Sequence, residues 1–186
     1  MSPDLIQQIA IWALPVLLAI TLHEAAHGFA ALRLGDDTAY RLGRVTLNPL
    51  KHIDPFGTVI MPALLLISGA PFVFGYAKPV PVNFRRLRDP KRGMVLVAAA
   101  GPGMNLALAL ASVILLRLWL DTTGISEGWV SGTLQASLVL NLVLAVFNMI
   151  PLPPLDGGRV AVGLLPRSLA IPLARLERWG MFIILG

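Results

Sequence analysis

Cysteine is absent from the 186 residues of this sequence, and charged residues make up only 13% of them. Without cysteine there is no disulfide framework and no thiolate ligand, so any metal must be held by His, Asp or Glu. A soluble domain carries about 25% charged residues, and this chain has too few to cover a surface in water. These two shortages exclude a disulfide-rich fold and argue against a soluble one.

Apolar residues are abundant instead, at 56% of the sequence with a mean hydropathy of +0.75. Lipid can cover the apolar outside of a membrane protein, so this composition indicates a polytopic membrane protein. The length suits one compact membrane domain, and we expect residues 1–186 to form a single domain. We assign the net charge of +5 to loops on the positive side of a bilayer and expect no nucleic-acid partner.

Long apolar segments predict an all-α polytopic membrane protein with about four transmembrane helices. Residues 5–34, 94–120 and 133–150 are apolar over lengths close to the about 20 residues that a membrane helix needs. Residues 171–186 begin a fourth apolar helix that contains only part of a span. We therefore expect this last helix to be incomplete and the natural chain to continue past Gly186.

Two segments between the first and second spans are less regular. Polar and apolar residues alternate over residues 40–45, which predicts a strand. With the turn signals Asn48-Pro49 and Asp54-Pro55 after it, this strand predicts a short β-hairpin or irregular loop at the cytoplasmic edge of the membrane. Residues 56–77 are apolar but interrupted by prolines and glycines, so they either cross the membrane or enter it and return.

The distribution of charge predicts the orientation of the chain. Basic residues are concentrated at residues 85–92, whereas residues 121–131 contain two acids and neither Lys nor Arg. By the positive-inside rule, the basic segment is cytoplasmic and the acidic loop is outside. The spans at residues 94–120 and 133–150 then run out and back, so the second of them ends on the cytoplasmic side, where the first span of the chain also ends. This arrangement requires residues 56–77 to be a re-entrant or bent segment, because a single crossing would place residues 85–92 outside.

The first span contains the sequence His23-Glu24-Ala25-Ala26-His27. Residues i and i+4 share one face of a helix, so His23 and His27 can direct ring nitrogens at one metal ion. Glu24 lies near that ion without binding it and can accept a proton from a water that zinc activates. The short pattern also occurs by chance. However, two His and one Glu in an apolar membrane helix are costly unless they pair or bind a ligand, so we favour a metal site.

A catalytic zinc normally has three protein ligands and one open position, so a third ligand is needed. Asp156 is the acid that follows the span at residues 133–150 on the predicted cytoplasmic side, in the segment NMIPLPPLDGG. The prolines and glycines of this segment favour a fixed, irregular backbone. A plain helix stop with a solvated Asp156 is the alternative, which the first motif makes less favourable. We interpret His52 as an interfacial loop residue rather than a ligand.

Together, HEAAH and NMIPLPPLDGG resemble the site-2 protease family of intramembrane zinc metalloproteases. The stretches GRVTLNPLKHIDPFGT, GYAKPVPVNFRRLRDPKRG and AAAGPGMN also look like those of its compact bacterial and archaeal members. The resemblance implies one Zn²⁺ per chain, held by His23, His27 and Asp156, with Glu24 as general base. Asn148 matches the family asparagine that engages the substrate backbone or stabilises the oxyanion.

Asn105, in the stretch AAAGPGMN, is a further polar candidate near the site for substrate or oxyanion. A hydrogen bond between two membrane helices is an equally good interpretation of this residue.

The resemblance implies an enzyme of regulated intramembrane proteolysis, which hydrolyses peptide bonds within or near transmembrane segments of membrane-protein substrates. It places the protein in the lipid bilayer of a bacterial or archaeal cell membrane, with substrates such as anti-sigma-factor-like regulators. A non-catalytic metal-binding scaffold or a transporter is the alternative. A transporter would need polar residues along several spans, and the predicted spans contain few.

Overall fold

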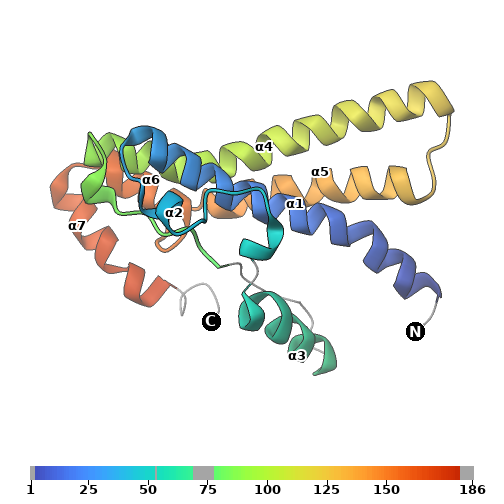
Figure 1. Cartoon of the computed structure of the whole chain (residues 1–186), viewed down its shortest axis with the longest axis horizontal. Helices are drawn as coiled ribbons and strands as arrows, with labels where there is room; N and C mark the ends of the chain where they lie inside the picture. Colours follow the sequence, from blue (N-terminus) through green and yellow to red (C-terminus); the bar gives the residue numbers. More distant parts are fainter. Residues whose placement is uncertain (1–2, 53, 69–77, 181–186) are drawn as a thin grey trace.

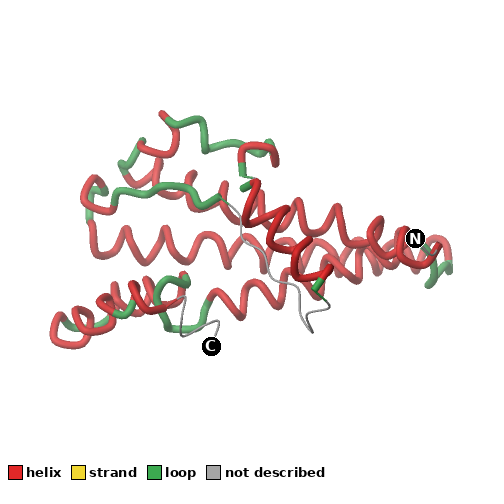
Figure 2. The backbone as a smooth tube through the Cα atoms, turned by 90° about the horizontal axis from the view of Figure 1, so that it is seen from below, coloured by secondary structure: helices red, strands yellow, loops and turns green. Residues whose placement is uncertain are grey.

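The structure is a computed structural model that describes residues 3–52, 54–68 and 78–180 (Figure 1). Over these residues it consists of helices and loops without a strand, as the tube in Figure 2 makes visible. The three long helices are α1 (Pro3–Leu34), α4 (Pro90–Thr123) and α5 (Trp129–Asn148). Each is long and apolar enough to cross a membrane. The predicted all-helical membrane class is therefore confirmed.

The predicted number of about four transmembrane helices is not reached in the part of the chain that the structure describes, which has three candidate spans. The fourth was expected at residues 171–186. Within that range the structure describes the end of a short helix, α7 (Arg167–Arg175), while residues 181–186 lie outside the described residues.

The three long helices form one bundle in which α1 and α5 run in the same direction and α4 runs against both (Figure 1). Gly124 and Gly128, both with positive φ, flank the short connection between α4 and α5. Beside this connection, Nε1 of Trp129 donates to the carbonyl of Ala10 at 3.1 Å and ties the start of α5 to α1. The first residues of α1 and α5 are thus at one end of the bundle, and their last residues are at the other.

Small side chains fill the interior of this bundle. The buried apolar residues of the long helices are mostly alanines: Ala19, Ala25 and Ala31 of α1, Ala98 and Ala109 of α4, Ala136 and Ala145 of α5. Small residues let helix backbones approach closely, which is how helices pack in lipid. Larger apolar side chains, including Leu14, Leu110 and Val143, are exposed on the outside of the bundle. This arrangement suits a surface covered by acyl chains.

The segment between α1 and α4 begins and ends at the same end of the bundle. The N–H of Arg88 donates to the carbonyl of Leu34, the last residue of α1, at 3.0 Å. The residues that leave α1 and those that enter α4 therefore lie next to each other. The intervening chain contains α2 (Thr38–Arg41), the short helix η1 (Pro49–Lys51), the π-helical η2 (Pro55–Ile60), α3 (Met61–Ile67) and η3 (Phe84–Arg86).

The predicted strand at residues 40–45 is wrong, and so is the β-hairpin built on it. The carboxylate of Asp36 accepts hydrogen bonds from the N–H and the hydroxyl of Thr38, which starts the helical turn of α2 instead. Gly43, with φ of +65°, then reverses the chain. Six alternating residues are too weak a signal against this local hydrogen bonding between side chain and backbone. The turn signals at Asn48 and Asp54 each cap a short helix.

The described part of residues 56–77 is helical, in η2 and α3, and α3 projects from the side of the bundle in Figure 1. Residues 55–67 are fewer than the about 20 needed to cross a bilayer. Residues 69–77 lie outside the described residues. A re-entrant or bent segment at 56–77 therefore stays a prediction.

Candidate metal centre

His23 and His27 lie side by side on α1, and both are buried. Their Nε2 nitrogens are 3.0 Å apart, and their ring planes are nearly perpendicular, at 80°. This is the arrangement expected for two imidazoles one helical turn apart that point at a common position. The helix alone therefore provides two of the three predicted ligands.

Asp156 brings a carboxylate to the same position from the other end of the sequence. Its Oδ2 atom lies 3.2 Å from Nε2 of His23 and 3.3 Å from Nε2 of His27. Asp156 is the first residue of α6 (Asp156–Leu164), which packs on α4 beyond the end of α5. The structure thus brings together the three residues that the sequence predicted as ligands.

The glycine pair after Asp156 allows this placement. A Cβ atom on Gly157 would lie 2.2 Å from the carbonyl oxygen of Met149, and one on Gly158 would lie 2.2 Å from the nitrogen of Pro153. The proline-rich connection therefore folds back against the first turn of α6, and only glycine fits there. This contact fixes the position of Asp156 relative to the end of α5.

The three ligand atoms fit a zinc ion. Atoms bound at about 2.0 Å to a tetrahedral zinc are about 3.3 Å from one another, close to the separations observed here. The space in front of them is kept open by Gly101 of α4. A Cβ atom built on this residue would lie 2.3 Å from Nε2 of His27 and 2.6 Å from Nε2 of His23.

Both imidazoles are held from behind by α4. Nδ1 of His27 is 2.7 Å from the carbonyl oxygen of Val97, and Nδ1 of His23 is 2.5 Å from Oδ1 of Asn105. A carbonyl can only accept, so the Nδ1 of His27 donates and the lone pair of its Nε2 faces the ligand position. Asn105 therefore lies behind a ligand, between helices, rather than in the space where a substrate would bind.

Asp156 has the charge that a metal ligand needs. Burial raises the pKa of this carboxyl, but when the rings of His23 and His27 are protonated and no metal is bound, their hydrogen bonds and charges more than offset burial and lower the pKa to about 2. The carboxyl is thus ionised at neutral pH. Two imidazoles and one carboxylate form a donor set that zinc prefers.

A cavity of about 280 Å³ opens in front of the three ligands. Glu24 lines it and is only partly buried, with Oε2 accepting a 2.8 Å hydrogen bond from the N–H of Val80. Asn148 lines the cavity from the last turn of α5, and its Nδ2 donates to the carbonyl of Leu144. Arg159 of α6 is at the edge, with its guanidinium 5.7 Å from the centre of the Phe84 ring. The general-base candidate and Asn148 thus share one cavity with the metal ligands.

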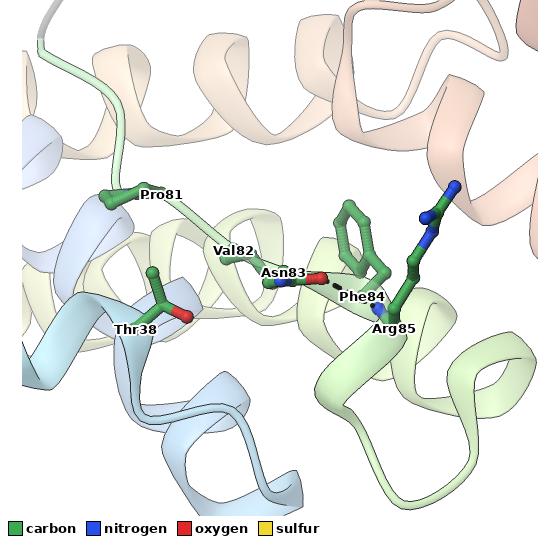
Figure 3. A pocket seen from close by; sticks show the side chains of 6 residues that line it. All are labelled: Thr38, Pro81, Val82, Asn83, Phe84 and Arg85. Atoms are coloured by element: carbon green, nitrogen blue, oxygen red, sulfur yellow. Dashed lines mark hydrogen bonds between the residues drawn. The ribbon is translucent and has the colours of Figure 1, made fainter.

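An extended stretch, residues 78–83, forms one wall of this cavity. Two carboxylates hold it, one on α1 and one in the turn after α1: Glu24 accepts from the N–H of Val80, and Oδ2 of Asp36 accepts from the N–H of Asn83 at 2.6 Å. Figure 3 shows the continuation of this stretch past Pro81 and Asn83 to Arg85, where it borders a second, open cavity of about 510 Å³ beside Thr38. The sequence predicted neither the buried Asp36 nor its contact with Asn83.

His52 lies outside the metal centre, as predicted. It is buried in the loop after η1, and its Nε2 is 3.0 Å from the carbonyl of Thr46. Gly101 and Val97 were missed as parts of the site. The Gly-Pro-Gly sequence around Gly101 was a signal that could have indicated close approach of two helices.

Comparison with known proteins gives consistent matches. The family model described as peptidase family M50 matches residues 120–185, which include Asn148 and Asp156. A protein of Bacillus subtilis named "Putative zinc metalloprotease YwhC" is 40% identical over 174 residues, which are 91% of this chain and 76% of the relative. No solved structure matches the chain.

Two mycobacterial proteins, both named "Putative zinc metalloprotease Rip2", also match. The one from Mycolicibacterium smegmatis is 32% identical over 90% of this chain and 62% of its own length. The one from Mycobacterium tuberculosis is 33% identical over 76% of this chain and 52% of its own length. The chain thus spans between about half and two thirds of these two longer relatives.

Proposed function

Because this chain belongs to peptidase family M50, we propose that it is a zinc endopeptidase of the site-2 type. Its substrates in this proposal are membrane proteins, cleaved within or near their transmembrane segments. The observation that carries the proposal is the convergence of His23, His27 and Asp156 on one position beside Glu24. Two helical histidines, a carboxylate from a distant part of the sequence and a nearby Glu that is not a ligand are typical of zinc proteases.

Each residue of the cavity has a defined task in this proposal. Zinc, when bound by His23, His27 and Asp156, supplies a Lewis acid that makes water a better nucleophile at neutral pH. Glu24 takes the proton of the attacking water and later gives it to the leaving amine. Its Oε2 is held by Val80, which leaves Oε1 for the proton.

Asn148 is suited to bind the substrate carbonyl as negative charge develops on its oxygen. One of its two amide N–H groups is engaged by the carbonyl of Leu144, and the other is left for a ligand in the cavity. A donor fixed in this way stabilises an oxyanion without reorganisation at the moment of reaction.

A helical substrate must unwind before its carbonyls can reach the site, because they are bonded within the helix. The stretch at residues 78–83 is suited to hold such an unwound segment as an added strand. Among the described residues, none donates to the carbonyls of Val80 and Val82 or accepts from the N–H of Val82. These groups are free to pair with an extended substrate. Membrane-anchored regulators such as anti-sigma factors are the substrate class that family analogy suggests.

The proposal is tested by three variants of the purified protein, assayed for cleavage of a membrane-embedded reporter and for zinc content. Glu24→Gln should abolish cleavage and retain one zinc per chain, because it removes the base and no ligand. Asp156→Ala should lose both cleavage and zinc. Glu127→Gln is the matched control, because Glu127 is exposed in the loop between α4 and α5, and it should leave both unchanged.

The same variants decide between an enzyme and a metal-binding scaffold or transporter. A scaffold would retain its zinc in Glu24→Gln and would cleave no reporter even in the wild type. Undiminished cleavage by Glu24→Gln would overturn the assignment of Glu24 as the base. Zinc content unchanged in Asp156→Ala would overturn the ligand set.

A further inference from the structure

A chain of buried polar side chains leads away from His23 across the bundle. Asn105 of α4, whose Oδ1 contacts His23, donates from Nδ2 to Oδ1 of Asn141 on α5 at 2.7 Å. Asn141 in turn donates from Nδ2 to the backbone carbonyl of Ser137, one turn earlier on α5, at 2.8 Å. Asn105 and Asn141 are fully buried, at 0% and 1% exposure. Such amides in an apolar bundle are costly unless every group is paired.

The direction of these hydrogen bonds is fixed at the end that is farthest from the metal centre. The carbonyl of Ser137 can only accept, so the amino group of Asn141 must face it and the oxygen of Asn141 must face Asn105. The amino group of Asn105 then faces Asn141, and its oxygen faces His23. Reversing the two amides would place two acceptors against each other at Ser137.

This direction determines which nitrogen of His23 carries the proton. Opposite the oxygen of Asn105, Nδ1 must be the donor, so the lone pair of the neutral ring is on Nε2, toward the ligand position. His27 needs no such chain, because its Nδ1 contacts the carbonyl of Val97 directly. One ligand is therefore oriented by backbone in a single step and the other through two asparagines.

We propose that Asn105 and Asn141 are positioning residues of the metal centre, and that Asn141 sets the tautomer of His23 by transmitting the polarity of the Ser137 carbonyl. Asn141 is linked to His23 through Asn105. The proposal rests on the proposed metal centre, and it deepens that site by naming what orients its first ligand.

The test measures the tautomer directly. The chain has three histidines, so the ring nitrogens of metal-free protein labelled with ¹⁵N-histidine give few signals in an NMR spectrum. The spectra are recorded at increasing pH until the ring-nitrogen signals stop changing, so that neutral rings are compared. In the wild type, we expect His23 and His27 to be protonated on Nδ1. In Asn141→Leu, we expect His23 to populate both tautomers while His27 is unchanged.

Zinc affinity is the second measurement. Removal of a residue that orients a ligand lowers metal affinity by about 10–100-fold. We expect zinc affinity to fall by this factor in Asn141→Leu. Asn141→Asp is the conservative variant, because a protonated carboxyl can donate to the carbonyl of Ser137 and present its other oxygen as an acceptor to Asn105. It should therefore restore the single His23 tautomer and the zinc affinity to within a few-fold of the wild type.

Ser131→Ala is the matched control for loss of a buried hydrogen bond on the same helix. The hydroxyl of Ser131 is buried and donates to the carbonyl of Ile125, at the opposite end of α5 from the metal centre. This variant should lower stability without changing either the tautomer or the zinc affinity.

The proposal is overturned if Asn141→Leu keeps a single Nδ1–H tautomer of His23 and binds zinc within twofold of the wild-type affinity. This holds whether or not the melting temperature of the variant changes. Failure of Asn141→Asp to restore what Asn141→Leu loses would also overturn it, because the effect would then be one of packing. If the wild type bound no zinc, the proposed function would fail, whereas the tautomer in metal-free protein would still test the role of Asn141.

Discussion

Gly101 of α4 lies against the ring of His27 of α1, so that a Cβ atom on the glycine would be 2.3 Å from the Nε2 nitrogen that faces the ligand position. Real carbon–nitrogen contacts are never this short, so any side chain at residue 101 would occupy the place of the metal or displace the imidazole. The open coordination space is therefore a property of α4 as well as of the ligands.

Gly101→Ala should consequently abolish zinc binding and cleavage. We expect zinc affinity to fall by more than the about 10–100-fold that changes behind a ligand produce, because the added methyl group collides with the ligands themselves. Gly103→Ala is the matched control, two residues further on the same helix, because nothing lies within 4 Å of its added Cβ atom. Metal content and reporter cleavage of the two proteins provide the check, and normal zinc binding by Gly101→Ala would contradict the geometry.

Asp36 provides a prediction on stability and pH. Burial raises the pKa of its carboxyl, but the hydrogen bonds from the side chain of Thr38 and the backbone of Asn83 and Thr38, with the charge of Arg86, outweigh burial and lower the pKa. A lowered pKa in the folded state stabilises the fold above the unfolded-state value of about 3.9, and this contribution is lost as the pH falls from there through the folded pKa.

Asp36→Asn should therefore be less stable than the wild type at neutral pH, by about 1.5–3 kcal/mol, the contribution of a hydrogen bond to a charged group. The difference should shrink below about pH 3.9. Thermal unfolding of the metal-free proteins in detergent as a function of pH measures it. Asp37→Asn is the control, because the neighbouring aspartate forms ion pairs with the exposed Arg41 and Arg86, which contribute little. Equal pH profiles for wild type and Asp36→Asn would contradict the assignment.

The orientation in the membrane is a prediction from charge, and the lack of cysteine makes it easy to test. Single cysteines at Ser126, in the loop between α4 and α5, and at Arg85, beside the metal-centre end of the bundle, are both at exposed positions. A maleimide that does not cross membranes should label Ser126→Cys on intact cells and Arg85→Cys only after permeabilisation. The reverse pattern would place the metal centre on the outer side.

The sequence was sufficient to predict the parts of the site that follow from helix geometry. His23 and His27 share a face because they are one turn apart, and the parity of the apolar spans put Asp156 at the same end of the bundle. Both predictions agree with the observed separations of 3.0–3.3 Å. These relationships depend only on periodicity and on the number of crossings.

The contacts that could not be predicted from the sequence depend on how the helices are rotated about their axes relative to one another. Asn105 points at His23, and Gly101 touches both rings, only because one particular face of α4 packs on α1. The same limit explains the wrong strand at residues 40–45, where the contact between Asp36 and Thr38 decided the local structure. The alternation of side chains carries no information about such a contact.

The distribution of the ligands along the chain has a consequence for biosynthesis. Two of them are on α1 and the third is on α6, after all the long helices. A ribosome therefore releases the first two ligands long before the third. During translation and membrane insertion the nascent chain has an incomplete ligand set, which is completed only when α5 is in place and Asp156 has docked. Completion of the ligand set thus coincides with completion of this part of the fold.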